Sequence, residues 1–494
     1  MQIEIYGLKL NKTLLIIFIK GEFVVFSYEI IDYIEKYKKK FFDVSKDIWD
    51  LAECRYEEYK SAEIFANLLE DEGFEVERGI GKIPTAFSGK FGEGKPYIAI
   101  LGEYDALEGL SQKRDTFCYS PLEGKNSGHG CGHNILGVAA LMAACALKYA
   151  VEKGDLKGTI YFFGCPAEEN GSGKTFMVRE GVFGGMDIVL AWHPECITTI
   201  TPSGCYAHNG KYYSFKGKAS HAAAAPELGR SALDAVELMN VGSNFLREHI
   251  PTEAKIHYAI TNAGGMSPNI VQENAEVLYT VRAPKMDMVL SITERVDNIA
   301  KGAALMTGTE VSERTVNSYA DIITNSVINN VIENVMNYIL PIDYTEDEFL
   351  YAEKFCNTFD DMAIKSVASR FVKEGISQSE ADILTSKSIY TDLPKFVHFN
   401  ASTDAGDVSH IAPLGHFTLT CFAMGTALHT WQITSQGLSS IAFKGLVAAS
   451  KIIALTAFEF LCDEKLVEKA REEFENSIKE NPYICGIPEN VFPV

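Results

Sequence analysis

Cys131 and His133 stand two residues apart in the segment 128–134, of sequence GHGCGHN, among glycines that let the backbone turn sharply. Thiolate sulfur and imidazole nitrogen are both ligands of Zn²⁺ and similar cations. The apolar run 135–144 follows directly and predicts a buried helix, so the pair lies at a helix N-terminus, which stabilises a thiolate. Taken alone this is weak evidence, because a free cysteine beside a histidine is more often a packed small residue than a ligand.

Residues of similar chemistry recur after apolar runs that predict buried strands. Four such runs each precede one or two of them: 97–102 before Asp105, 159–164 before Glu168 and Glu169, 188–192 before His193, and 418–423 before His429. In open α/β sheets, ligands bind at the carboxyl ends of the strands. We therefore expect these side chains to gather at one edge of a sheet.

The donor set defines a chemistry. One thiolate, three imidazoles and one carboxylate can hold two divalent cations and leave a position open for water. One of the two adjacent glutamates then remains free to act as a general base. Such soft ligands favour Mn²⁺ or Zn²⁺ over Mg²⁺. The alternative, a solvated Glu-Glu turn with ordinary core histidines, fits each residue singly but fits the whole set poorly.

The elements that must position these residues alternate between helix and strand, which indicates an α/β protein. Residues 28–75 carry apolar residues at helical spacing, and 402–407 form a polar turn by their composition. From about residue 205 the order becomes strand–helix–strand–strand–helix–strand, the ferredoxin-like order, which predicts an inserted domain with an open sheet. We divide the chain into an N-terminal extension (1–27), a catalytic domain in two parts (28–207 and 318–494, with a helical surface insertion near 344–390) and the inserted domain (208–317).

Composition sets limits on partners. The chain has 494 residues and a formal net charge of −21, which argues against nucleic acid or an anionic membrane as a partner. Eleven cysteines without a repeating spacing indicate free thiols in a reducing compartment, so we expect a cytoplasmic protein. The apolar segment 14–19 is too short to span a bilayer, and we interpret it as part of an extension or as a buried strand rather than a signal peptide.

Five motifs resemble those of the metallopeptidase and amidohydrolase family that contains carboxypeptidase G, aminoacylase and indole-acetyl-amino-acid hydrolases. They are CGHN at 131–134, GCPAEENGSGKT at 164–175, GKASHAAAAP at 217–226, GGMSPN at 264–269 and LHTW at 428–431. The resemblance runs from about residue 28 to about residue 460. It implies a zinc-peptidase-like catalytic domain that binds two metal ions, with an inserted ferredoxin-like α+β dimerisation domain. Gly130 departs from the pattern, since relatives commonly carry alanine there, and we expect it to add loop freedom.

The resemblance also implies roles for individual residues. Glu168 falls on the family's general base, and His221 on a histidine that reaches the substrate carbonyl, often from the partner subunit. Asn269 and, by a looser match, Arg282 fall on substrate contacts, and Asp105 is expected to support a metal-binding histidine. The metal ligands are then Cys131, His133, Glu169, His193 and His429.

The expected reaction is hydrolysis of the amide bond of an N-acyl amino acid, with p-aminobenzoyl-glutamate as the expected substrate. The expected assembly is a homodimer, or a hetero-oligomer that includes a related subunit. The alternative of a dipeptidase or N-acyl-amino-acid deacylase with the same site stays open. So does that of a non-catalytic, metal-binding subunit of a hetero-oligomer and, more weakly, that of a thiol enzyme with Cys131 as its nucleophile.

Overall fold

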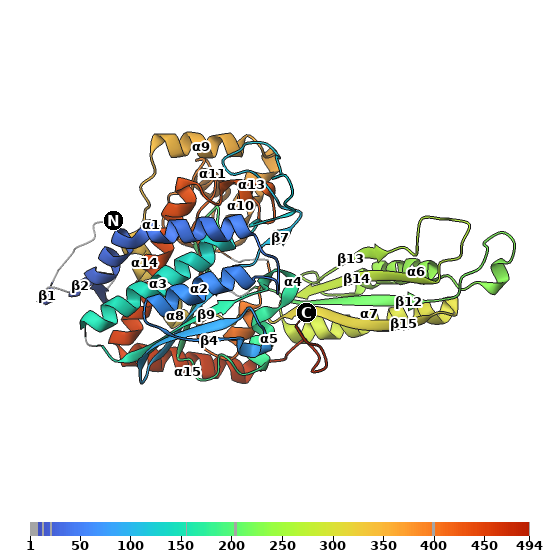
Figure 1. Ribbon diagram of the computed structural model, residues 1–494, viewed down its shortest axis with the longest axis horizontal. Helices are drawn as coiled ribbons and strands as arrows, with labels where there is room; N and C mark the ends of the chain where they lie inside the picture. The colour runs from blue at the N-terminus through green and yellow to red at the C-terminus, as the bar shows by residue number, and fades with distance from the viewer. Residues whose placement is uncertain are drawn as a thin grey trace.

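The computed structural model describes residues 8–11, 14–19, 22–154, 156–201, 205–397 and 401–493. A broad body holds most of the helices, and an elongated second part extends from one side of it (Figure 1). Within the predicted N-terminal extension, residues 1–7, 12, 13, 20 and 21 lie outside the described residues. The described remainder forms an antiparallel sheet of three strands: β1 (Leu8–Asn11), β2 (Leu14–Ile19) and β3 (Glu22–Ser27).

An eight-stranded sheet forms the centre of the body, in the order β16-β11-β17-β10-β6-β9-β5-β4. Its middle strands β17, β10, β6 and β9 run parallel, and β5, β4 and β11 pair antiparallel to their inner neighbours. The parallel strands are almost wholly buried, as expected of strands covered on both faces. The strands are β4 (Glu75–Arg78), β5 (Phe87–Glu93), β6 (Tyr97–Glu103), β9 (Gly158–Cys165), β10 (Ile188–Glu195), β11 (Thr199–Ile200), β16 (Lys395–Phe396) and β17 (Leu414–Thr420).

Long helices cover one face of this sheet and short ones the other. The first group shares one large apolar core: α1 (Tyr28–Leu51), α2 (Tyr59–Asp71), α3 (His133–Gly154), α8 (Ser326–Ile339), α14 (Ser440–Cys462) and α15 (Glu464–Glu480). On the opposite face lie α5 (Gly173–Arg179) and α12 (Ala405–Ser409). Helices α3 and α14 are long and apolar enough to cross a membrane, but 89% and 83% of their apolar windows are buried inside the protein. Both are therefore core helices.

The second part is a four-stranded antiparallel sheet in the order β13-β14-β12-β15, with α6 and α7 packed against it. Its elements are β12 (Ala207–Lys216), α6 (Ala232–Leu246), β13 (Lys255–Asn262), β14 (Asn274–Ala283), α7 (Met286–Thr307) and β15 (Glu310–Tyr319). The strand and helix order is the one that the sequence predicts. In the register, His208 faces Arg282 and Tyr319 next to the body, whereas Lys216 faces Asn274 and Glu310 at the far end.

The remaining elements connect these layers. They are η1 (Ile80–Lys82), β7 (Leu107–Glu108), β8 (Ser127–Gly128), α4 (Glu168–Gly171), η2 (Pro226–Leu228), η3 (Arg247–His249), α9 (Glu346–Cys356), α10 (Asp361–Lys373), α11 (Gln378–Leu384) and α13 (Trp431–Gln436). Helix α9 lies on the outside of the body (Figure 1). The predicted polar turn at 402–407 was wrong from residue 405 onward, where α12 begins. Asp404 and Asp407 are fully buried, because each accepts hydrogen bonds from buried donors.

Candidate metal centre

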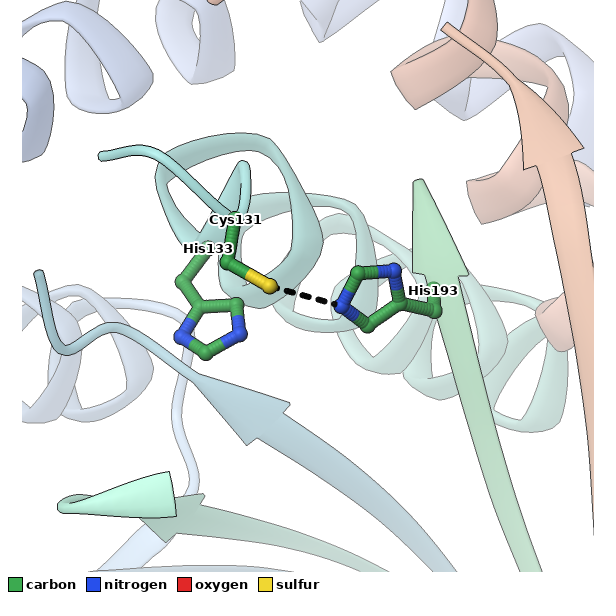
Figure 2. Close-up of side chains that lie close together, drawn as sticks. All are labelled: Cys131, His133 and His193. Atoms are coloured by element: carbon green, nitrogen blue, oxygen red, sulfur yellow. Dashed lines mark hydrogen bonds between the residues drawn. The ribbon is translucent and has the colours of Figure 1, made fainter. Parts of the chain in front are cut away.

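Two groups of metal-binding side chains meet at Cys131. Its sulfur lies within 4.8 Å of ligand atoms of His133 and His193 in one group, and of Glu169 and His429 in the other. Figure 2 shows the first group, in which the Cys131 sulfur points at the His193 ring, 3.3 Å from Nε2. The five residues that the sequence predicts as ligands are therefore brought together in one place. Cys131 is common to both groups, as a thiolate shared between two cations would be.

The backbone delivers these side chains from strand ends and tight turns. His133 is the first residue of α3, and Gly132 before it has φ +81°, a conformation that favours glycine. Glu169 follows β9 in a turn where Ala167, Asn170 and Ser172 all have positive φ. His429 has φ +61°, and its N–H donates to the Gly130 carbonyl at 2.9 Å. Non-glycine residues at positive φ cost free energy, and such strain clusters at functional sites.

Asp105 fixes two of the candidate ligands at once. Its Oδ1 lies 2.9 Å from His133 Nδ1, and its Oδ2 accepts the Glu169 N–H at 2.7 Å. With Nδ1 held in this way, Nε2 is the atom that His133 presents to the cluster. In His193, Nδ1–H donates to the Pro194 carbonyl at 2.8 Å, which likewise leaves Nε2 toward Cys131. Carboxylate or carbonyl partners of this kind orient metal-binding histidines.

The residues present fit a pair of divalent cations. Among the described residues, His133 Nε2 and Glu169 Oε1 are buried atoms without a hydrogen-bond partner. A buried polar atom left unpaired is costly, and a metal ion is one partner that removes the cost. Three imidazoles, a thiol and a carboxylate are the donors that Zn²⁺ and Mn²⁺ accept.

The electrostatics of the cluster are strongly perturbed. Burial, followed by the charges of Glu169 and Glu168, raises the pKa of the Cys131 thiol well above its ordinary value. Burial opposes a charge on His133, but Asp105 and Glu103 outweigh it and raise the His133 pKa to about 10. Burial likewise opposes a charge on Glu169, but the hydrogen bond from His429 and the charge of His133 lower its pKa to about 2. The carboxylates thus make the cluster a strong attractor of positive charge.

Glu168 lies beside this cluster in a different environment. It belongs to neither group around Cys131, although its carboxylate approaches His133 and Glu103. Burial, and then the negative charges of Glu103 and Glu169, raise the Glu168 pKa well above its ordinary value. The hydroxyl of Tyr319, at the end of β15, donates to its backbone carbonyl at 3.2 Å. Adjacent carboxylates with opposite pKa shifts are typical of sites where one holds charge and the other exchanges a proton.

A buried ion-pair cluster supports the site, and the sequence analysis missed it. Lys174 Nζ lies 2.7 Å from Glu103 Oε1 and 2.5 Å from Asp404 Oδ1. All three side chains are buried, and Glu103 Oε2 lies 3.4 Å from His133 Nε2. A fully buried lysine needs such pairing, because unpaired burial of its charge is very costly. The charged residues of 103–105 and 402–407 were visible in the sequence, but their contact across the chain was not.

The predicted substrate residues of the second sheet fall into two places. Arg282 lines a cavity of about 390 Å³ together with Glu169, so it lies close to the metal centre. His221 and Asn269 lie in the two loops at the far end of the sheet, where the Ala222 N–H donates to the Asn269 carbonyl at 3.0 Å. Ten residues of strand span about 33 Å. A single chain in this conformation therefore does not bring His221 to Cys131.

Gly130 has a steric role rather than the expected conformational one. It is not among the positive-φ residues, whereas Gly132 is. A Cβ atom at Gly130 would lie 2.2 Å from Leu110 Cδ1, well inside van der Waals contact. The expectation that Gly130 adds loop freedom is thus wrong, because Leu110 occupies the space that an alanine would need.

An α/β body with two donor groups around one thiol, and a ferredoxin-like sheet beside it, defines the class of metal-dependent amidohydrolases. Comparison with known families agrees with this class. Residues 99–483 match the model of Peptidase family M20/M25/M40. The chain belongs to this family and is a metal-dependent amidohydrolase.

Among curated proteins, the chain is 43% identical to one of the two subunits of p-aminobenzoyl-glutamate hydrolase of Escherichia coli, over 94% of this chain and 98% of that protein. It is 29% identical to the Xaa-Arg dipeptidase of Mus musculus, over 88% and 89% of the two chains.

Solved structures agree in fold. A dinuclear metal-binding peptidase of family M20 from Bacillus subtilis matches with a TM-score of 0.52 at 15% identity, covering 84% of this chain and 98% of that one. An aminobenzoyl-glutamate utilization protein from Klebsiella pneumoniae matches with a TM-score of 0.55 at 16% identity, covering 86% and 98%. At these identities the likeness shows the fold alone.

Proposed function

We propose that the chain hydrolyses p-aminobenzoyl-glutamate to p-aminobenzoate and glutamate, with two Mn²⁺ or Zn²⁺ ions bound at the cluster. The observation that carries the proposal is the pair of donor groups sharing Cys131, with Glu168 left outside both. The 43% identity to a subunit of the Escherichia coli hydrolase, over nearly the whole of both chains, supports this substrate.

The ligand assignment divides the five donors between two sites. Cys131, His133 and His193 would hold one cation, and Cys131, Glu169 and His429 the other. Bound cations act as Lewis acids that polarise the amide carbonyl and lower the pKa of water toward about 7.

Glu168 is the proposed general base. It takes a proton from the attacking water and passes it to the leaving nitrogen as the amide bond breaks. The raised pKa of its carboxyl group favours holding that proton between the two steps. Arg282, in the cavity beside Glu169, would bind the carboxylate of the glutamate, a geometry that suits a guanidinium.

His221 is proposed to stabilise the oxyanion that develops on the carbonyl, from the partner subunit of a dimer. Its Nδ1 accepts hydrogen bonds from the N–H groups of Ala223 and Ala224, at 3.2 and 3.1 Å. Nε2 therefore carries the ring proton and is available as a donor. One such donor contributes roughly 3–4 kcal/mol of transition-state stabilisation in other enzymes. Asn269, in the loop that contacts His221, would take part in the same contact.

The assembly that this requires is a homodimer formed through the second sheet. Its edge strand β13 has one neighbour, β14, and most of its residues are exposed. Pairing of such an edge with its copy about a two-fold axis is a common way to cover it. A hetero-oligomer is a second candidate, because the chain is also 30% identical, over 47% of its length, to the other subunit of the Escherichia coli hydrolase. We place the protein in the cytoplasm, where its eleven thiols would stay reduced.

The test is hydrolysis by the purified protein, stripped with a chelator and reloaded with Mn²⁺ or Zn²⁺. The panel contains p-aminobenzoyl-glutamate, N-acetyl amino acids and dipeptides that end in arginine. We expect activity to vanish on stripping, to return with metal and to be highest on p-aminobenzoyl-glutamate. Highest activity on arginine dipeptides would favour the dipeptidase alternative, which the mouse relative supports. Full activity without metal would point to the thiol mechanism.

A further inference from the structure

The cavity beside the metal centre is formed by both parts of the molecule. Its wall includes Cys54, Arg55, Glu108 and Glu169 from the body, and His208 and Arg282 from the second sheet. At about 390 Å³ it has the size of a small-molecule site. The two arginines enter it from separate elements, Arg55 from the segment between α1 and α2 and Arg282 from β14.

Neither guanidinium is neutralised within the chain. Arg55 is exposed, and its Nη1 donates to the Asn170 carbonyl at 2.8 Å, next to the metal ligand Glu169. Arg282 is half-buried on the sheet. Among the residues that the structure describes, no carboxylate lies within ion-pair distance of either arginine. A partly buried cation without a counter-charge is unfavourable, so a cavity with two of them favours an anionic ligand.

The position of the substrate follows from its charges. The only anionic groups of p-aminobenzoyl-glutamate are its two carboxylates, and both belong to the glutamate. The glutamate must therefore lie in the cavity with the two arginines, and the uncharged aminobenzoyl group on the other side of the scissile amide. Glu108 and Glu169 also line the wall. Glu169 is engaged with His429 at 3.3 Å, so it does not cancel the positive charge of the arginines.

We propose that Arg55 determines the specificity for an acidic leaving amino acid, by binding its side-chain carboxylate while Arg282 binds the α-carboxylate. This inference rests on the proposed function and narrows it to N-acyl derivatives of glutamate. The same guanidinium repels a cationic side chain, so substrates that end in arginine are disfavoured. Loss of a hydrogen-bonded charge partner in a site of this kind costs about 1.5–3 kcal/mol, or roughly 10- to 100-fold in affinity.

The experiment compares p-aminobenzoyl-glutamate with p-aminobenzoyl-glutamine, which differ only in the charge of the side chain. We expect the metal-loaded wild-type protein to prefer the glutamate conjugate at least about 10-fold in kcat/KM. Arg55→Gln should lower kcat/KM for the glutamate conjugate roughly 10- to 100-fold, mainly through KM, and leave the glutamine conjugate within about 3-fold. Arg55→Lys, which keeps the charge, should recover part of the preference. Arg282→Gln should impair both conjugates alike.

Arg295→Gln is the matched control. Arg295 is also an exposed arginine that donates to a backbone carbonyl, that of His249 at 2.7 Å, but it lies on α7 and does not line the cavity. It should leave the preference unchanged. Equal losses on both conjugates in Arg55→Gln would mean that Arg55 only supports the Asn170 turn, and no loss on either would mean that it does not bind substrate. Each result overturns the inference. A wild-type protein inactive on both conjugates would instead refute the proposed function.

Discussion

The body and the second sheet hold their functional residues in opposite ways. In the body, Cys131, His133 and Glu169 are buried, and Asp105 holds two of them through hydrogen bonds of 2.7 and 2.9 Å. In the second sheet, His221 is exposed at the tip of a loop, and its ring is held by backbone N–H groups of its own loop. The metal centre is thus preorganised within one chain, whereas the contribution of His221 depends on an assembly or a movement.

This difference indicates a division of labour. Buried, multiply bonded ligands keep their geometry through turnover, as metal binding requires. An exposed side chain on a separate sheet can be brought in only when substrate and partner are in place. Arg282 lies between the two cases, since it belongs to the second sheet but lies at the end that touches the body.

The largest expected effect tests whether the centre is one unit. Cys131→Ala removes the donor common to both groups, so we expect loss of both metals and of measurable activity. His429→Ala removes a donor from one group only, and its protein should keep about one metal per chain. Elemental analysis after dialysis against a weak chelator measures both. Equal metal contents in the two variants would show that Cys131 does not bridge.

The next effect separates the two adjacent glutamates. Glu168→Gln should keep both metals and lower kcat by roughly 10²- to 10⁴-fold, because an amide cannot take the proton. Glu169→Gln should instead lose metal. Both are measured by parallel metal analysis and steady-state kinetics. If the two phenotypes came out exchanged, our assignment within the pair would be wrong.

A smaller effect concerns the link between the two regions. His221→Ala should keep metal and dimer but lose most turnover, roughly 10²-fold if one oxyanion donor is removed. When it is mixed with Glu168→Gln protein, a mixed dimer has one site with both defects and one with neither, so activity should partly return. Subunit exchange is checked with differently tagged chains. Absence of recovery despite exchange would place His221 outside the partner's site.

The smallest effect is on stability, at the junction of the two regions. Burial, helped by the nearby charge of Arg282, lowers the pKa of His208 to about 4. The unfolded chain binds a proton near pH 6.5, so this stability is complete above pH 6.5 and is lost as the pH falls toward 4. The loss amounts to about 2–3 kcal/mol at most.

His208→Gln should remove that pH dependence. Its amide can still donate to Asn317 Oδ1, the partner of His208 Nε2 at 2.8 Å. Urea unfolding at pH 8 and pH 5 measures the change, and the variant should lose less stability than the wild type between the two values. Equal losses in the two proteins would show that His208 is protonated in the folded state.

Much of this arrangement could be predicted from the sequence, because local patterns encode it. The buried strands at 97–102, 159–164 and 188–192 and the element order of the second sheet follow from apolar spacing, and the structure has them in these places. The gathering of Cys131 with His429 followed from the rule that parallel strands share their carboxyl edge. Helix α15 was not predicted, although its amphipathic spacing is visible.

Other features depend on contacts that no local pattern reveals. The pairing of Lys174 with Asp404 joins residues 230 positions apart, and only the fold makes a buried lysine tolerable there. Segment 402–407 is polar for this reason, and composition alone could not distinguish a buried charged cluster from a solvated turn. The clash of a Gly130 side chain with Leu110 likewise follows from packing and not from backbone preference.

The order of the strands has a consequence for biosynthesis. Strand β10 pairs in parallel with β17, although the whole second sheet and helices α8 to α11 lie between them in the chain. His429, which follows β17, is therefore synthesised more than two hundred residues after His193. At about 5–20 residues per second, a ribosome needs roughly 10–50 s for this interval. Throughout it, the emerging chain exposes an unpaired edge of β10 and a metal centre without its last ligand, so this enzyme can mature only after nearly all of it has been made.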